Sequence, residues 1–156
     1  MFKTILWATD GSETAARALP YALDLADPDH AKLIIAHARE TFPGRAGAYP
    51  VLADENELRE QIGSQVDELR SGGLDATFVV RTCTAGHAAH TIAEIAEEAG
   101  ADLIVVGTHG YGRVAGLLIG SVTQALLHED VCPVLAIPTG SPVKEPKHLL
   151  VTSTAQ

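Results

Sequence analysis

Five short apolar runs, separated by segments of helical spacing, constrain the fold of this chain more than any other feature. The runs cover residues 3–8, 32–38, 77–82, 103–106 and 133–138. Between them, apolar residues recur at intervals of three and four, as on the buried face of a helix. Strands that alternate with helices and are apolar on both faces form parallel sheets covered on two sides. Because crossovers between parallel strands are right-handed, we expect a single-domain, doubly wound, five-stranded parallel sheet of the Rossmann-like α/β class, with helices on both faces.

Two stretches lie outside this alternation. Residues 40–53 are rich in Gly, Pro and Ala, and we expect them to form an irregular, mobile loop. Residues 139–156 have mixed polarity and follow the last strand. We therefore expect one domain over residues 1–138 and a C-terminal tail over 139–156.

The composition limits the classes of partner. The formal net charge of −9 implies no basic surface, so we expect no nucleic-acid partner. No apolar run approaches the roughly 20 residues of a membrane span, so we expect no membrane partner. The first residues lead directly into a strand without the layout of a signal peptide, which favours a cytoplasmic location.

A passage bounded by glycines follows the fourth strand. Gly107-Thr108-His109-Gly110 is followed, nine residues later, by Gly120-Ser121-Val122-Thr123, where a helical pattern begins. Glycines let a backbone approach a ligand closely, and hydroxyls supplement the amide hydrogens that have no partner within the first turn of a helix. These features predict an anion site, with phosphate as the anion. The alternative is a pair of tight turns that bind no ligand.

Two other strand ends carry candidate chemistry. The first strand ends in Thr9-Asp10-Gly11-Ser12 and the second in His37-Ala38. Ligands of a doubly wound sheet bind beyond the carboxyl ends of the strands, where the winding reverses. If the first and fourth strands are neighbours there, Asp10 faces the glycine passage. Its carboxylate could accept hydrogen bonds from ribose hydroxyls or hold Mg²⁺ against phosphates, or it could only cap the following helix.

Two common phosphate motifs do not fit the passage. A P-loop requires a Gly-Lys pair, and the chain contains none. The dinucleotide fingerprint requires Gly-x-Gly-x-x-Gly, but Gly110 and Gly112 are followed by Gly116, which is one residue too far.

These residues instead resemble the nucleotide-binding signature of the universal stress protein (UspA-like) family. The resemblance rests on Gly107-x-x-Gly110, nine further residues and Gly120-Ser121, together with the first strand end and the runs 101–107 and 132–138. It spans about residues 3–138 and implies the fold of the universal stress protein type. The complete signature is similar to that of the ATP-binding branch of the family.

The resemblance implies a role for each matching position. Residues that would contact the adenosine moiety are Ala8, Thr9 and Asp10, with the backbone of Ala38 against the adenine ring. Residues that would line the ribose and bind the phosphates are Val106, Gly107, His109, Gly110, Gly120, Ser121, Val122 and Thr123. The implied ligand is ATP or another adenine nucleotide, with Mg²⁺, and the implied assembly is a homodimer formed through strand 133–138.

The chain has no identifiable catalytic set, neither Ser-His-Asp nor Cys-His. A nucleotide-binding regulatory or stress-response protein is therefore favoured over an enzyme. Two alternatives stay open: a slow Mg-dependent ATP hydrolase or phosphotransferase that uses Asp10, and a nucleotide-free interaction protein of the same fold.

Overall fold

The strands in the described part of the chain form a single sheet with β1 at its centre. The computed structural model describes residues 2–26, 30–45, 47–109 and 119–140. β1 (Thr4–Ala8) pairs in parallel with β2 (Lys32–Phe42) on one side and with β5 (Leu103–Gly107) on the other. Outside these lie β4 (Ala76–Thr84), parallel to β2, and β6 (Val134–Ile137), parallel to β5. The parallel order β4-β2-β1-β5-β6 reverses its winding between β1 and β5, which confirms the predicted doubly wound fold.

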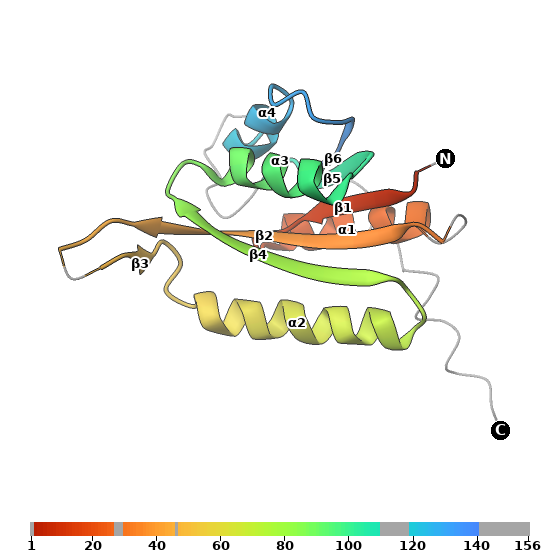
Figure 1. Cartoon of the computed structure of the whole chain (residues 1–156), viewed down its shortest axis with the longest axis horizontal. Helices are drawn as coiled ribbons and strands as arrows, with labels where there is room; N and C mark the ends of the chain where they lie inside the picture. Colours follow the sequence, from red (N-terminus) through yellow and green to blue (C-terminus); the bar gives the residue numbers. More distant parts are fainter. Residues whose placement is uncertain (1, 27–29, 46, 110–118, 141–156) are drawn as a thin grey trace.

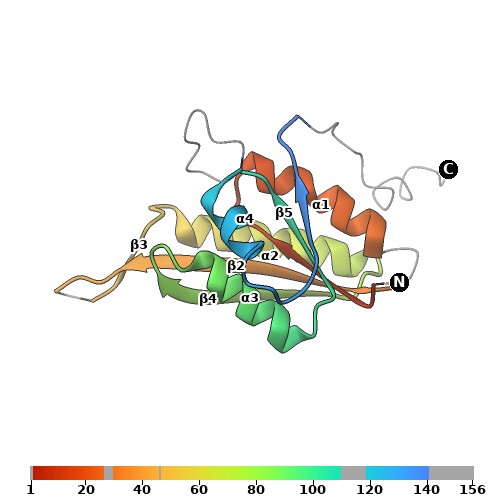
Figure 2. The same cartoon turned by 90° about the horizontal axis from the view of Figure 1, so that it is seen from above.

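The helices cover both faces of the sheet, as the sequence predicts. α1 (Glu13–Ala26) and α2 (Glu55–Ser71) pack on one face, and α3 (Ala88–Ala99) and α4 (Ser121–Leu126) on the other. Figure 1 shows α3 and α4 above the sheet with α2 below it, and Figure 2 gives the view from above. Alternate residues of β1 enter different cores: Ile5 and Trp7 face α1 and α2, whereas Leu6 and Ala8 face α3 and α4.

The sheet has six strands within the described residues, and the prediction of five was wrong by one. β2 runs on to Phe42, and a two-residue strand, β3 (Tyr49–Pro50), pairs with its end in antiparallel fashion. All of β3, and the extension of β2 from Glu40 onward, fall within residues 40–53, for which we expected a loop. The extension is fixed by long-range pairing, because β2 stays in register with β4 as far as Thr41 opposite Thr84. Figure 1 shows the end of β2 and β3 projecting beyond the helices.

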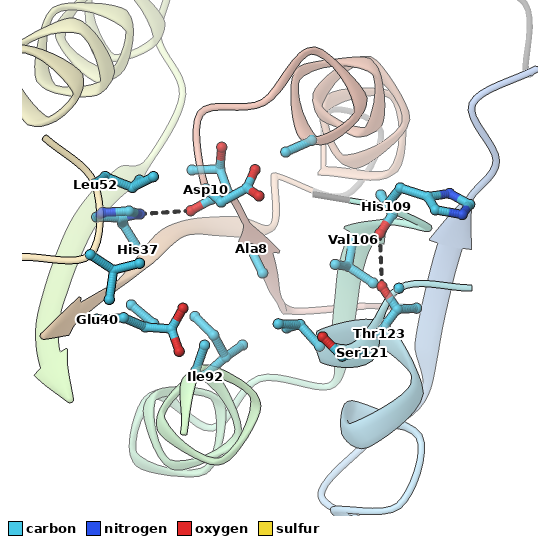
Figure 3. A pocket seen from close by; sticks show the side chains of 18 of the residues that line it. Ala8, Asp10, His37, Glu40, Leu52, Ile92, Val106, His109, Ser121 and Thr123 are labelled. Carbon is cyan, nitrogen blue, oxygen red and sulfur yellow. Dashed lines mark hydrogen bonds between the residues drawn. The ribbon is translucent and has the colours of Figure 1, made fainter. Parts of the chain in front are cut away.

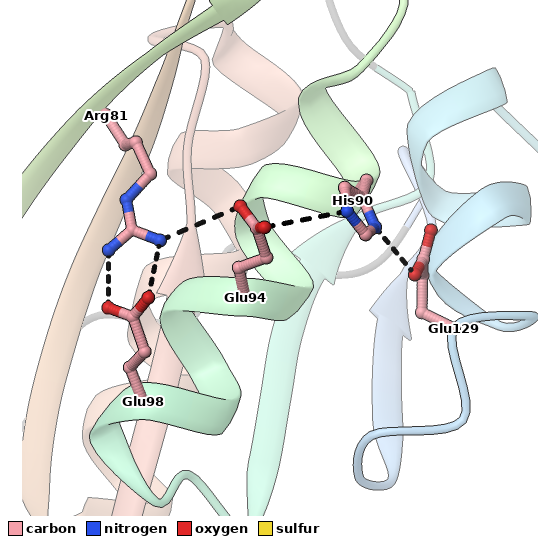
Figure 4. A network of polar contacts seen from close by, with 5 residues as sticks. All are labelled: Arg81, His90, Glu94, Glu98 and Glu129. Carbon is pink, nitrogen blue, oxygen red and sulfur yellow. Dashed lines mark hydrogen bonds and ion pairs between the residues drawn. The ribbon is translucent and has the colours of Figure 1, made fainter.

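A chain of polar contacts joins β4, α3 and the turn after α4 (Figure 4). The Arg81 guanidinium holds both oxygens of Glu98, with its Nη1 3.0 Å from Oε1 and its Nη2 2.5 Å from Oε2. Glu94 lies 3.7 Å from Arg81 Nη1 and 3.6 Å from His90 Nε2. The other ring nitrogen of His90 is 3.2 Å from Glu129 Oε2. The turn that follows α4 is thereby tied to α3.

Two further points concern the expected absence of a membrane span and the predicted C-terminal tail. No helix of the described residues is long and apolar enough to cross a membrane. Of the predicted tail, residues 141–156 lie outside the described part of the chain.

Candidate functional site

A cavity of about 350 Å³ opens at the carboxyl ends of β1, β2 and β5, beside the reversal of winding. All the predicted site residues that the structure describes line it: Ala8, Thr9, Asp10, Ala38, Val106, Gly107, His109, Gly120, Ser121, Val122 and Thr123. Gly110, the remaining predicted residue, lies outside the described residues. Three segments that are distant in the sequence therefore converge on one space. Its size is typical of a small-molecule site.

Asp10 occupies the turn between β1 and α1. Its Oδ1 accepts a hydrogen bond of 2.9 Å from the Ser12 amide. The helix cap is Ser12, whose Oγ accepts from the Ala15 amide at 3.2 Å. The cap of α1 is therefore Ser12 and not Asp10. The turn holds the Asp10 carboxylate between the His37 and His109 sides of the cavity, as Figure 3 shows.

Gly11 closes this turn, and its backbone conformation favours glycine. Its φ of +80° lies in the left-handed region, where other residues are strained. A Cβ there would also stand 2.1 Å from Leu58 Cδ1 of α2. The position of Asp10 thus depends on the packing of α2 against its turn.

Gly107 and Thr123 join β5 to α4. The buried Thr123 hydroxyl donates a hydrogen bond of 2.8 Å to the Gly107 carbonyl. A Cβ at Gly107 would lie 2.7 Å from the Thr14 carbonyl oxygen, so the packing of α1 alone requires glycine here. The hydroxyl hydrogen of Thr123 is committed to this bond. Of the hydroxyls predicted for phosphate, that of Ser121 is the one on an exposed side chain at the cavity.

Gly120 precedes α4 and lies close to the backbone that follows β5. Its dihedral angles, φ −68° and ψ 156°, suit any residue. A Cβ would nevertheless come within 3.0 Å of the Thr108 carbonyl oxygen and 3.3 Å of His109 Cα. Glycine also offers no side chain to accept from the first amides of α4. The close approach of the Thr108–His109 backbone, rather than the backbone conformation of Gly120 itself, explains why this residue is glycine.

A buried pair at the opposite side of the cavity was not predicted. His37 Nε2 lies 2.8 Å from Glu55 Oε1, and the side chains are only 2% and 3% exposed. His37 Nδ1 lies 2.9 Å from the Thr9 carbonyl oxygen. A carbonyl only accepts, so Nδ1 carries a hydrogen, and a second hydrogen joins Nε2 to Glu55. The pair fixes the start of α2 against the ends of β1 and β2.

The extended end of β2 and the segment after β3 form the remaining wall. Glu40, Val51 and Leu52 line the cavity there, and Ile92 of α3 lines it beside Glu40. The Val51 amide donates to the Glu40 carbonyl at 2.9 Å, which ties the two segments together. Sequence reasoning missed this wall because it falls within the predicted loop. The one available signal was alternation, since Ala38 and Glu40 continue the pattern of a strand with one face toward the cavity.

The sequence as a whole places this chain in a known family. A sequence profile of the universal stress protein family matches residues 1–138. The chain belongs to the universal stress protein family, as the resemblance of its motifs implied.

Individual relatives agree with this assignment. A universal stress protein of Thermus aquaticus is 37% identical over 140 residues, which cover 88% of this chain and 99% of the relative. The universal stress protein MJ0577 of Methanocaldococcus jannaschii is 30% identical over 154 residues, covering 88% and 95% of the two chains. A solved structure of MJ0577 superposes with a TM-score of 0.68 at 26% identity over 91% of this chain and 99% of that one. A crystal structure of a universal stress protein in complex with cAMP has a TM-score of 0.60 and is 30% identical, covering 87% and 96% of the chains.

Proposed function

We propose that this protein binds an adenine nucleotide, with ATP as the principal ligand, and acts as a nucleotide-regulated stress-response protein. The observation that carries the proposal is the cavity itself, which joins the Gly120-Ser121 end to the end formed by Ala38 and Leu52. We further propose that the protein is cytoplasmic and works as a homodimer, with residues 1–138 as the functional domain.

The distribution of charge supports one direction for the proposed nucleotide. Glu40 and Glu55 line the β2 side of the cavity, and Asp10 lies at the end of β1. Phosphates are repelled by carboxylates and are bound by amide and hydroxyl hydrogens. The phosphates therefore lie toward Gly120 and Ser121, and the base lies toward β2.

Asp10 lies between these two ends, where the ribose and the first phosphate of such a ligand would pass. A carboxylate can accept hydrogen bonds from ribose hydroxyls. Mg²⁺ commonly reaches a nucleotide site through the phosphates and one or two carboxylates. Asp10 is the carboxylate that we propose for this role.

The apolar wall suits the faces of a purine. Val51, Leu52 and Ile92 present aliphatic side chains to the β2 end, next to the backbone of Ala38. Most small-molecule sites combine such apolar surface with a few polar groups that fix orientation. The relative crystallised in complex with cAMP supports an adenine nucleotide as the class of ligand.

The test begins with the purified protein. We expect that denaturing it releases an adenine nucleotide, detected by mass spectrometry of the supernatant. Calorimetry on stripped protein then measures binding of ATP, ADP and AMP, with and without Mg²⁺. Absence of any adenine nucleotide from the supernatant, together with no heat of binding, would overturn the proposal.

A further inference from the structure

We propose that Glu40 selects the base of the nucleotide, by accepting a hydrogen bond from the 6-amino group of adenine. The inference rests on the proposed function, because it concerns the same cavity. It assigns to Glu40 a role in specificity, by which the site distinguishes adenine from a purine with an oxygen at position 6.

Glu40 is held in place from two sides. Its backbone carbonyl accepts from the Val51 amide. Its Oε1 accepts a hydrogen bond of 2.6 Å from the Gly86 amide, in the turn between β4 and α3. The side chain is half-buried, and Figure 3 shows its carboxylate directed into the cavity, on the same side as Ile92. A carboxylate anchored in this way has a defined orientation toward a ligand.

One oxygen of Glu40 remains for the ligand. Among the described residues, no donor contacts Oε2, whereas Oε1 is occupied by the Gly86 amide. An ionised carboxylate only accepts hydrogen bonds. Oε2 can therefore accept a hydrogen bond from an N–H or O–H group on the part of the ligand that lies at this end.

The other carboxylates of the cavity have different roles. The side chain of Glu55 is buried and is hydrogen-bonded to His37. Asp10 lies at the end of β1, with its Oδ1 accepting from the Ser12 amide. Glu40 is thus the acid beside Ala38, where the proposed orientation of the nucleotide places the base.

The chemistry of the base decides which purine fits. Adenine carries a 6-amino group, which donates, whereas hypoxanthine carries a 6-oxo group, which accepts. An oxo group facing a carboxylate oxygen leaves both acceptors without a hydrogen. Hydrogen bonds to charged groups contribute enough that we expect ATP to bind roughly ten- to a hundredfold more tightly than ITP.

The experiment measures the affinities of ATP and ITP by calorimetry in the wild type and in Glu40→Gln. In the variant, the amide oxygen keeps the Gly86 hydrogen bond and the amide NH₂ faces the ligand, where it donates to a 6-oxo group. We expect the preference for ATP to fall at least tenfold. Because both ligands carry the same phosphates, their affinity ratio cancels any general effect of removing a negative charge.

Glu60→Gln is the matched control, since Glu60 is an exposed glutamate of α2 that does not line the cavity. This control should keep the wild-type ratio. Tight ATP binding with no discrimination against ITP, or an unchanged ratio in folded Glu40→Gln, would overturn the role of Glu40 and leave nucleotide binding standing. Absence of binding by both nucleotides in the wild type would overturn both proposals together.

Discussion

Gly107 and Gly120 are both part of the predicted signature, yet they are glycines for different reasons. At Gly107 an added Cβ meets the backbone of Thr14, so the packing of α1 explains the residue without any ligand. At Gly120 the added Cβ meets the backbone of Thr108 and His109 at the edge of the cavity. Backbone packing therefore disfavours a side chain at both positions, and substitution tests whether Gly120 also has the proposed role in binding.

Replacing Gly120 by Val should weaken nucleotide binding by at least tenfold. The side chain would occupy the space proposed for the phosphates, and the Thr108 carbonyl would have to shift by a few tenths of an ångström. Overpacking of this kind costs about 1–3 kcal/mol of folding free energy, which leaves a testable folded protein. Calorimetry on the folded variant checks the affinity, and an affinity equal to that of the wild type would refute the placement of the phosphates.

Gly107→Ala serves as the contrasting variant. Its methyl group would strike backbone atoms of α1, so we expect a lower urea midpoint even in the absence of nucleotide.

The buried His37–Glu55 pair should contribute to stability whether or not ligand is bound. Glu55→Ala leaves a buried ring nitrogen without its partner, which costs about 1–3 kcal/mol. Glu55→Gln has nearly the same shape and keeps one hydrogen bond, so its loss should be smaller. Urea unfolding of the two variants measures the difference. Equal destabilisation by Ala and Gln would mean that shape, and not hydrogen bonding, sets the contribution of Glu55.

At the level of elements, hydrophobic periodicity predicted the positions of the strands and helices. Within the described residues, the five parallel strands and the four helices lie where the apolar patterns placed them. The extension of β2 through Arg39 and Glu40 was missed because these residues are polar and the extension depends on pairing with β4. A register between segments about 40 residues apart is not encoded in any local window.

The same distinction applies to the candidate site. Short motifs with recognisable turn chemistry contain Asp10, Gly107 and Gly120, so these residues can be identified from the local sequence. Glu55 lies within an ordinary amphipathic helix, and its role appears only when α2 packs against His37. Residues that gain a function through tertiary contact escape prediction from one sequence.

The contacts between α3 and the turn after α4 should respond to pH. The hydrogen bond and the charge of Glu129, helped by Glu94, raise the pKa of His90 above its ordinary value of about 6.5. A raised pKa in the folded state means that the charged His90 stabilises the fold at low pH, and that this contribution is lost as the pH rises through the folded-state pKa.

We therefore expect the difference in urea midpoint between wild type and His90→Asn to shrink from pH 5.5 to pH 8.5. Glu129→Gln should remove most of this pH dependence, because Glu129 is the principal cause of the shift. The effect should also weaken in high salt, since the pair is exposed. A difference in urea midpoint between wild type and His90→Asn that grows with pH would contradict the inference that the charged form of His90 stabilises the fold.

At the scale of the whole molecule, β6 leaves one edge of the sheet open in the described part of the chain. The carbonyls of Pro133 and Ile137 accept from amides of β5 and of the residue after it. Because backbone groups alternate between the two sides of a strand, those of Val134 and Ala136 point away from β5. An edge of this kind can pair with the same strand of a second copy.

We expect light scattering at micromolar concentration to give about twice the chain mass of 16.4 kDa. Ala136→Pro removes an outward amide without touching the pairing with β5, so it should shift the protein toward a monomer. Far-UV circular dichroism verifies that the variant is folded. A wild-type mass equal to one chain would refute dimerisation through strand 133–138.

The residues at the two ends of the cavity are synthesised at different times, because Ala38 and Glu40 precede Gly120 and Ser121 by about 80 residues. β1 is synthesised first, but its neighbour β5 begins only at Leu103. The amides of Lys3 and Thr4 also have no Asp102 carboxylate to bond until that residue has been added. A nascent chain that has reached the end of α3 already contains Glu40 but lacks Gly120 and Ser121. If nucleotide binds as proposed, it can stabilise only a chain that contains both ends of the cavity. A chain that stops at the end of α3 would also expose the edge of β1, which favours aggregation.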